Sequence, residues 1–224
     1  MLTQINNVLS AEELAELYPI IESADWLPGR HSAGATAAAQ KANEEMNQDT
    51  DAWKRINQFV VQRLYRHTEF QSSVLPHRVS AAFVSRYSNG MSYKPHVDDP
   101  VMGQASGRYR SDVAVTVFLS DHNSYDGGEL VVHTRFGPVS VKLPAGSAVA
   151  YPASSLHEVT AVTRGQRLAC VLWAQSLVRD AHQREILSDL DDARRALKLS
   201  TPKAQVTSRV DQAYLNLVRM WAEV

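Results

Sequence analysis

The stretch VSAAFVSRYSNGMSYKPHVD, residues 79–98, combines the features that decide the fold. It opens with a run of β-branched and aromatic residues, passes through the pair Asn89-Gly90 and ends on His96-Val97-Asp98. Such runs, bounded by Asn-Gly or similar pairs, are typical of short strands joined by tight turns. Residues 79–98 therefore predict a strand, a turn and a second segment that carries polar side chains near its end.

The same pattern continues to residue 175, with short β-rich runs separated by turn signals. The further runs are DVAVTVFLS (112–120), ELVVHT (129–134), VSVKL (139–143), SAVAYP (147–152), HEVTAV (157–162) and RLACVLWAQ (167–175). Many short strands at close, regular spacing indicate an all-β sandwich or barrel. No helical pattern separates these runs, which argues against a parallel sheet, and no glycine-rich nucleotide motif is present.

Helical patterns flank this region, so we expect three parts: 1–78, 79–175 and 176–224. In the first part, Ser10 and Glu13 form a capping box, and a second amphipathic helix begins near Thr50 or Asp51. The last part shows two apolar stripes: Ile186, Leu190, Ala193 and Leu197, then Val210, Tyr214, Leu217, Val218 and Trp221. These stripes suit packing on the β core or on a second subunit, and we expect a homo-oligomer formed through them.

The segment between the two N-terminal helices, SAGATAAAQKANEEMNQD (32–49), is rich in small and polar residues. It predicts a long loop. Long ordered loops are often functional, but the sequence is equally compatible with a mobile surface loop.

Composition narrows the class of protein. Of the 224 residues, 44% are hydrophobic and 21% are charged, which is ordinary for a globular protein, and the net charge of −1 argues against a nucleic-acid binder. No apolar run approaches the ~18 residues of a membrane-spanning helix, and the N-terminus does not resemble a signal peptide. The single cysteine, Cys170, excludes an internal disulfide, so we expect a cytoplasmic protein without membrane partners.

His96 and Asp98 carry the first sign of chemistry. On a strand, residues two apart share a face, so the imidazole and the carboxylate are neighbours. A third ligand would complete a facial set that suits non-haem Fe(II) and leaves three coordination positions open. The candidates are His122 in a polar turn, His133 within a strand and His157, which opens a strand well after Asp98.

Arg167 begins an apolar strand ten residues after His157. A guanidinium on an inward-facing position is costly unless it is paired, and its planar fork suits a carboxylate. A surface arginine at a strand end is the alternative reading.

These motifs, taken together, resemble one family. The segment from Tyr87 to Asp98 resembles the Y-x-x-G-x-x-Y-x-x-H-x-D motif of prolyl 4-hydroxylase-like Fe(II)/2-oxoglutarate dioxygenases. The later D-G-G-E-L, P-x-x-G-S-A-V-x-Y-P, L-H-E-V and T-x-G-x-R segments follow the order and spacing of that family. The chain as a whole is similar to bacterial PKHD-type hydroxylases.

The resemblance implies a double-stranded β-helix, or jelly-roll, core over residues 79–175 with helices on both sides. It implies His96, Asp98 and His157 as the iron ligands and Arg167 as the partner of the distal carboxylate of 2-oxoglutarate. Tyr87 falls where relatives place a hydroxyl near 2-oxoglutarate, and Trp173 where some have a wall of the pocket; a core tryptophan is the other reading of Trp173.

One departure from the family concerns the strand after the H-x-D segment. Phe118 stands where some relatives have a tyrosine that assists the distal carboxylate. A hydroxyl would then come from Thr116, or be absent.

The implied activity is hydroxylation of a C–H bond, with Fe(II) as cofactor, 2-oxoglutarate and O2 as cosubstrates and ascorbate as reductant. The substrate is not readable and can be a small molecule or a peptidyl residue; Arg108, Tyr109 and Arg110 are candidates to contact it. A non-catalytic metal or 2-oxoglutarate sensor and a cupin-like metalloenzyme are the alternatives, and the latter would not need Arg167.

Overall fold

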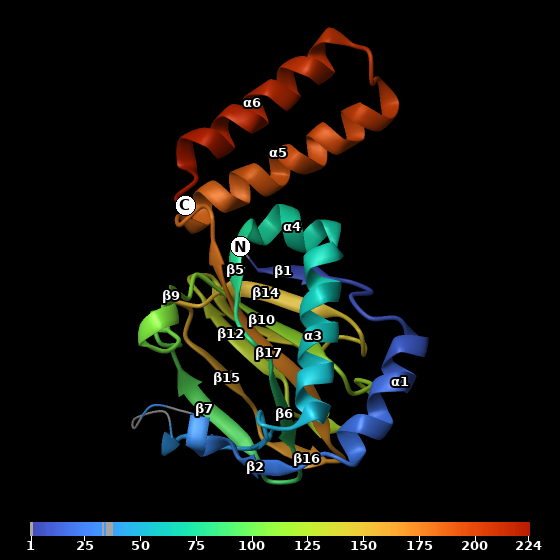
Figure 1. The fold of residues 1–224 in the computed structure, drawn as a ribbon, viewed down its shortest axis with the longest axis vertical. Coiled ribbons are helices and arrows are strands. Elements are labelled where there is room, and N and C mark those ends of the chain that lie inside the picture. The colour runs from blue at the N-terminus through green and yellow to red at the C-terminus, as the bar shows by residue number, and fades with distance from the viewer. Residues whose placement is uncertain (1, 33, 35–37) are drawn as a thin grey trace.

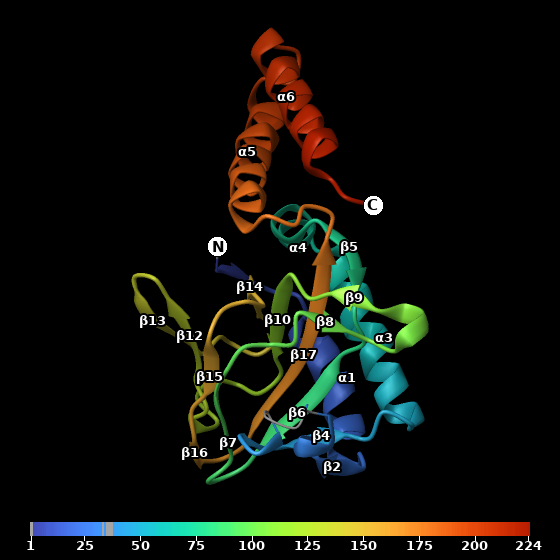
Figure 2. The same cartoon turned by 90° about the vertical axis from the view of Figure 1, so that its left-hand side faces the viewer.

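The structure of the chain is a computed structural model that describes residues 2–32, 34 and 38–224. Figure 2 shows two facing sheets, with helices α1 (Ala11–Glu22) and α3 (Asp51–Arg66) against the outer side of the larger one. Helices α5 (Ala181–Ser200) and α6 (Gln205–Trp221) form a hairpin that projects beyond the sheets (Figure 1). The fold is thus mainly β with flanking helices, as predicted.

All paired strands of the two sheets run antiparallel, as expected for strands joined by tight turns. The larger sheet has the order β1 (Thr3–Ile5), β14 (Ala148–Pro152), β10 (Val113–Phe118), β17 (Arg167–Ser176), β6 (Phe83–Tyr87), β4 (Glu44–Met46) and β2 (Trp26–Pro28), with β5 (Pro76–Val79) also paired to β17. The smaller sheet has the order β13 (Gly137–Val141), β12 (Leu130–Thr134), β15 (His157–Val159), β7 (Ser92–His96) and β3 (Lys41–Ala42). Two short pairs complete the strands: β8 (Val101–Met102) with β9 (Tyr109–Arg110), and β11 (Asp126–Gly127) with β16 (Val162–Arg164).

Strand β10 shows how the sequence builds the layers. Its six residues, VAVTVF, are all buried because both faces of the strand are covered. The three valines pack with residues of α1 and α3, whereas Ala114 and Phe118 pack between the sheets. Since side chains alternate along a strand, Thr116 faces the same inner space, where the pocket described below lies.

The two N-terminal helices begin where their capping residues predict. Ser10 and Glu13 form the reciprocal capping box of α1, with hydrogen bonds of 2.9 and 3.2 Å. Thr50 caps α3 and accepts a hydrogen bond from the backbone N–H of Trp53. A third helix, α4 (Thr68–Val74), follows α3. Residues 1–78 also contribute β1 to β5, so this part of the chain supplies strands to both sheets besides its helices.

The segment predicted as a long loop is partly structured. Strand β3 pairs with β7 of the smaller sheet, with Lys41 opposite Tyr93, and β4 pairs with β6 of the larger sheet, with Glu45 opposite Ser85. The described part of this segment therefore joins the edges of the two sheets rather than lying free on the surface. Strands this short form by adding to existing sheet edges, which local sequence does not reveal.

The stripe predicted for α5 is buried only in part. Leu190 packs against the cluster at the base of the hairpin, whereas Ile186 is 51% exposed, Ala193 is exposed, and the fully buried Leu187 lies outside the stripe. The stripe predicted for α6 is found, with Tyr214 buried against the base of the hairpin. The structure describes a single chain, and the homo-oligomer through these helices stays a prediction.

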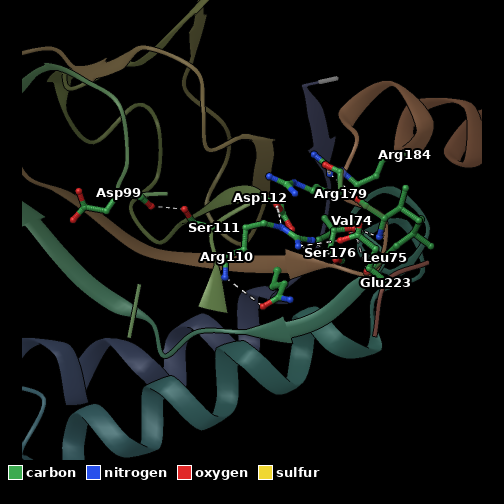
Figure 3. Close-up of polar contacts among 12 residues, drawn as sticks. Val74, Leu75, Asp99, Arg110, Ser111, Asp112, Ser176, Arg179, Arg184 and Glu223 are labelled. Atoms are coloured by element: carbon green, nitrogen blue, oxygen red, sulfur yellow. Dashed lines mark hydrogen bonds and ion pairs between the residues drawn. The ribbon is translucent and has the colours of Figure 1, made fainter. Parts of the chain in front are cut away.

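A polar network ties the hairpin to the β core (Figure 3). Arg110 on β9 donates to Asp112 at 2.7 Å, to Glu223 at 3.2 Å and to the Ser176 carbonyl at 3.3 Å. Asp112 in turn accepts a hydrogen bond from the Ser176 N–H at 2.9 Å.

Within the described ranges, the chain has no helix with the length and hydropathy that crossing a bilayer requires.

Candidate metal centre

Two neighbouring strands bring the predicted metal ligands together. His96 ends β7 and His157 begins β15, and the two residues lie opposite each other in the antiparallel pairing of these strands. Asp98 follows two residues after His96, and its Oδ1 lies 3.9 Å from His96 Nε2 and 3.8 Å from His157 Nε2. Ligand atoms on one metal ion, each bound at about 2.1 Å, lie about 3–4 Å apart, so this set fits a single ion.

The hydrogen bonds of the two histidines leave Nε2 of each ring free to bind a metal. His96 Nδ1 lies 2.8 Å from the Lys94 carbonyl, and His157 Nδ1 lies 3.0 Å from the Ser155 carbonyl. A carbonyl only accepts, so each Nδ1 carries the proton and each Nε2 presents its lone pair toward Asp98. This second contact fixes both the tautomer and the orientation of each ring.

Burial shapes the charge of the centre. It lowers the pKa of His96 to about 4, helped by the nearby His157 and Lys41, so this imidazole is neutral and able to bind a metal at neutral pH. Burial also raises the pKa of Asp98, against the opposing effects of His157 and of a hydrogen bond from Trp173. An isolated buried carboxylate is costly, and a bound cation would compensate it.

Two aromatic residues support this ligand set. The Tyr93 ring stacks on His96, with centroids 3.6 Å apart and planes at 18°. Trp173 donates from its indole N–H to Asp98 Oδ2 at 2.8 Å and packs edge-on against Phe83. Trp173 thus lines the pocket and also orients a ligand, a contact that sequence reasoning missed because it links β17 to the loop after β7.

Arg167 lies buried on β17, at 1% exposure, and faces the same space. Its Nε and Nη1 have no hydrogen-bond partner in the part of the chain that the structure describes. The guanidinium carbon lies 5.1 Å from the Tyr87 ring and 5.6 Å from the Phe118 ring. A buried, unpaired guanidinium with aromatic walls is a fitting receptor for a carboxylate, which excludes the alternative of a surface arginine.

Hydroxyl groups lie around this guanidinium. Burial raises the pKa of Tyr87 to about 12, so its hydroxyl is a permanent donor at neutral pH. Thr116 lines the pocket, while Phe118 is fully buried and offers its ring rather than a hydroxyl to the guanidinium. Tyr125, which sequence reasoning missed, has a buried hydroxyl without a partner among the described residues; its position directly before Asp126-Gly127-Gly128 was the available signal.

Gly128 explains why this turn is glycine-rich. Its φ of +66° favours glycine, and a Cβ here would lie 3.1 Å from both Arg167 Cδ and the Tyr125 ring. Any side chain at this position would press on the two residues that form the closed end of the site.

One pocket of about 700 Å³ contains all six predicted site residues. They are His96, Asp98, His157, Arg167, Tyr87 and Trp173. Lys41 and Glu45, from the segment predicted as a loop, also line it, as does Tyr109. Arg110 instead binds Asp112 and Glu223, and Arg108 is exposed outside the pocket.

The other two histidine candidates lie elsewhere. His133 on β12 contacts Glu158 at 3.4 Å, and His122 lies beside Asp121 in its turn. Among the described residues, the one group of three or more His, Cys, Asp or Glu side chains able to hold a metal is His96, Asp98 and His157.

Fold and site together define a jelly-roll oxygenase with a His-Asp-His centre, and comparisons with known proteins agree. Residues 82–175 match the 2OG-Fe(II) oxygenase superfamily. The chain is 50% identical over 224 residues to a PKHD-type hydroxylase of Thioalkalivibrio sulfidiphilus, and 43% identical over 228 residues to one of Xanthomonas axonopodis pv. citri. Both matches cover 100% of each chain.

Solved structures share the fold at low sequence identity. A Pseudomonas putida prolyl-4-hydroxylase aligns with a TM-score of 0.53 at 18% identity, over 78% of this chain and 92% of that one. A prolyl hydroxylase from Trichoplax adhaerens aligns with a TM-score of 0.56 at 17% identity, over 83% and 86%. The chain belongs to the PKHD-type hydroxylases of the 2OG-Fe(II) oxygenase superfamily, and it is an Fe(II)- and 2-oxoglutarate-dependent dioxygenase.

Proposed function

We propose that this dioxygenase hydroxylates a C–H bond of a small-molecule or peptidyl substrate, with His96, Asp98 and His157 as the iron ligands and Arg167 as the anchor of 2-oxoglutarate. The observation that carries the proposal is the presence, in one pocket, of a three-residue ligand set and a buried guanidinium without a partner among the described residues.

The ligand set divides the work between its residues. The Nε2 atoms of His96 and His157 supply neutral donors, and the carboxylate of Asp98 supplies the one negative charge. Three protein ligands leave room on the metal for the cosubstrates. When bound, Fe(II) supplies the oxidising chemistry that couples substrate hydroxylation to conversion of 2-oxoglutarate and O2 into succinate and CO2.

Arg167 and Tyr87 hold the far end of the cosubstrate in this proposal. The guanidinium pairs with the distal carboxylate, and the Tyr87 hydroxyl, which is protonated at neutral pH, donates to it. Pairing removes the cost of an isolated buried charge. Trp173 and Phe83 form an apolar wall that limits water near the metal.

Three further features are proposed on the resemblance and the composition. Ascorbate acts as the reductant, the protein works in the cytoplasm, and its partners include neither nucleic acid nor membrane. Succinate formation with and without ascorbate tests the first of these directly.

The test of the proposed function is 2-oxoglutarate turnover by the purified protein with Fe(II) and O2, followed as succinate release. We expect slow succinate release without added substrate, abolished in His157→Ala and lowered by at least about tenfold in Arg167→Met at limiting 2-oxoglutarate. His133→Ala is the matched control, since His133 lies outside the pocket, and it keeps wild-type turnover. Equal turnover in His157→Ala and wild type contradicts the ligand assignment.

A further inference from the structure

The charged side chains of the pocket can be accounted for one by one. Asp98 belongs to the metal set and Arg167 to the cosubstrate site. Lys41 and Glu45 pair with each other at 2.5 Å, with side chains only 11% and 10% exposed, so together they present no net charge. After these assignments, two charged residues that line the pocket remain unused, Arg78 and Asp99.

Both remaining residues are exposed, so they lie at the mouth of the pocket. Neither forms an ion pair with any residue in the ranges 2–32, 34 and 38–224. Arg78 lies against the β8–β9 hairpin, with its Nη2 3.1 Å from the Cβ position of Gly107. Asp99 lies at the N-terminal segment, with its Oδ2 3.9 Å from the Cβ position of Gly34.

Tyr109 holds the Arg78 side chain in place. The guanidinium carbon lies 5.1 Å from the Tyr109 ring centroid, within the range of a cation–π contact. A cation–π contact uses none of the guanidinium N–H groups as hydrogen-bond donors, and no hydrogen bond from Arg78 is found within the described residues. The result is a preorganised donor fork at the pocket mouth, and such forks match planar oxyanions such as carboxylates.

The pocket has room for a second molecule besides the cosubstrate. Its volume of about 700 Å³ lies well inside the ~300–1,000 Å³ range of sites for drug-sized ligands, whereas 2-oxoglutarate is a five-carbon acid. The pocket lining also includes apolar side chains, among them Val97, Val101 and Phe83. This lining suits the uncharged body of a substrate.

We infer that Arg78, held by Tyr109, is a specificity residue that binds an anionic group of the substrate, a carboxylate or a similar planar oxyanion. This inference rests on the proposed function, since the substrate must reach the same metal centre. Asp99 sets the direction: its negative charge repels the anionic end of the substrate, which therefore points toward Arg78. A second anchor in the same pocket as the metal ligands would orient the C–H bond that reacts.

The test uses benzoate and its neutral isostere benzamide as probes. The anaerobic protein is first saturated with Fe(II) and 2-oxoglutarate, so that Arg167 is occupied, and each probe is titrated calorimetrically. We expect benzoate to bind at least about tenfold more tightly than benzamide. We expect Arg78→Gln to abolish the preference for benzoate over benzamide and Arg78→Lys to keep part of it.

Arg108→Gln is the matched control, because it removes the same charge from an exposed residue close by that does not line the pocket. It keeps the preference for benzoate. Equal binding of the two probes to the wild type, no binding of benzoate, or an undiminished preference in Arg78→Gln overturns the inference.

The absorption band of chelated 2-oxoglutarate is recorded throughout the titration. A band that is present while the benzoate preference is missing means that the inference about Arg78 fails and the proposed function stands. Absence of the band before any probe is added means that the proposed function itself fails.

Discussion

The Arg167 side chain is only 1% exposed, and two of its nitrogens lack partners in the described part of the chain. An unpaired buried ion destabilises a fold, and an apolar replacement is often neutral or stabilising. We therefore expect Arg167→Met to leave the Tm of the metal-free protein unchanged or higher. We also expect 2-oxoglutarate to raise the Tm of the wild type with Fe(II) bound, and that of the variant much less. Equal rises in both proteins, measured by calorimetry, would contradict this role.

Trp173 orients Asp98 through a single hydrogen bond of 2.8 Å. Loss of a hydrogen-bond partner of a metal ligand typically lowers metal affinity by about 10–100-fold. We therefore expect Trp173→Phe to weaken Fe(II) binding by about tenfold while the protein stays folded. Anaerobic Fe(II) titration measures this. Trp53→Phe is the control: it removes a bond to the Ala82 carbonyl, outside the pocket, and leaves the affinity unchanged.

His96 makes stability depend on pH in a known direction. Burial lowers its pKa from 6.5 to about 4 in the folded, metal-free protein. Between pH 6.5 and about pH 4, His96 is protonated in the unfolded chain but not in the folded chain. Protonation therefore favours the unfolded chain in this range, and the stability contributed by this residue is present above pH 6.5 and lost toward pH 4.

Urea unfolding at several pH values between 7 and 4.5 measures this dependence. We expect the free energy of unfolding to fall less steeply in His96→Gln than in the wild type. The raised pKa of Asp98 acts in the opposite direction in both proteins, and comparing the two isolates the histidine. Parallel pH profiles would contradict the expectation.

At this scale, spacing alone paired His96 with Asp98 and left the third ligand open among three histidines. His157 and Arg167 were selected by the family resemblance, and the structure places all four residues in one pocket. The contact from Trp173 to Asp98 could not be predicted, because it depends on which strands become neighbours.

Strands β3 and β4 carry the Lys41–Glu45 pair, which spans the two sheets beside the metal centre. Removing one member of a buried pair leaves an uncompensated charge, so Lys41→Met or Glu45→Gln alone should destabilise the fold by about 2–4 kcal/mol. The double variant should lose less than the sum of the single losses.

Chemical denaturation of the four proteins measures this coupling. The exposed Lys54–Asp51 pair is the control, and its cycle should give a coupling below about 1 kcal/mol. Additive losses at Lys41 and Glu45 would show that the pair does not act as a unit.

Elements with local signals were predicted correctly, and elements without them were not. Ser10 and Thr50 mark helix starts through hydrogen bonds to residues three positions away. In contrast, β3 and β4 depend on sheet edges far along the chain. The buried face of α5 was predicted only in part: Leu190 meets the cluster that contains Leu75 and Val178, but Leu187 meets it in place of Ile186.

The hairpin of α5 and α6 projects beyond the two sheets (Figures 1 and 2). Asp112, with a side chain 7% exposed, holds both Arg110 and the Ser176 N–H where the chain leaves β17 (Figure 3). We expect Asp112→Ala to lower the free energy of unfolding by about 1–3 kcal/mol, because it leaves the Ser176 N–H without its acceptor and removes one of three partners of Arg110.

The same change should make the junction at residues 176–180 more sensitive to limited proteolysis. Asp192→Ala is the control, since it removes an exposed carboxylate paired with Arg195 on α5. Equal proteolysis of the two variants would contradict the view that Asp112 anchors the hairpin.

At the scale of the whole molecule, the jelly roll holds one proposed Fe(II) centre at which 2-oxoglutarate would chelate the metal. Its most direct test is anaerobic titration of the metal-free protein with Fe(II) and then 2-oxoglutarate, followed by absorption at about 500 nm, where bidentate chelation at a facial Fe(II) site gives a weak charge-transfer band. We expect this band in the wild type, its loss in His157→Ala, and a requirement for more 2-oxoglutarate in Arg167→Met. Bound iron without a band in the wild type would contradict it.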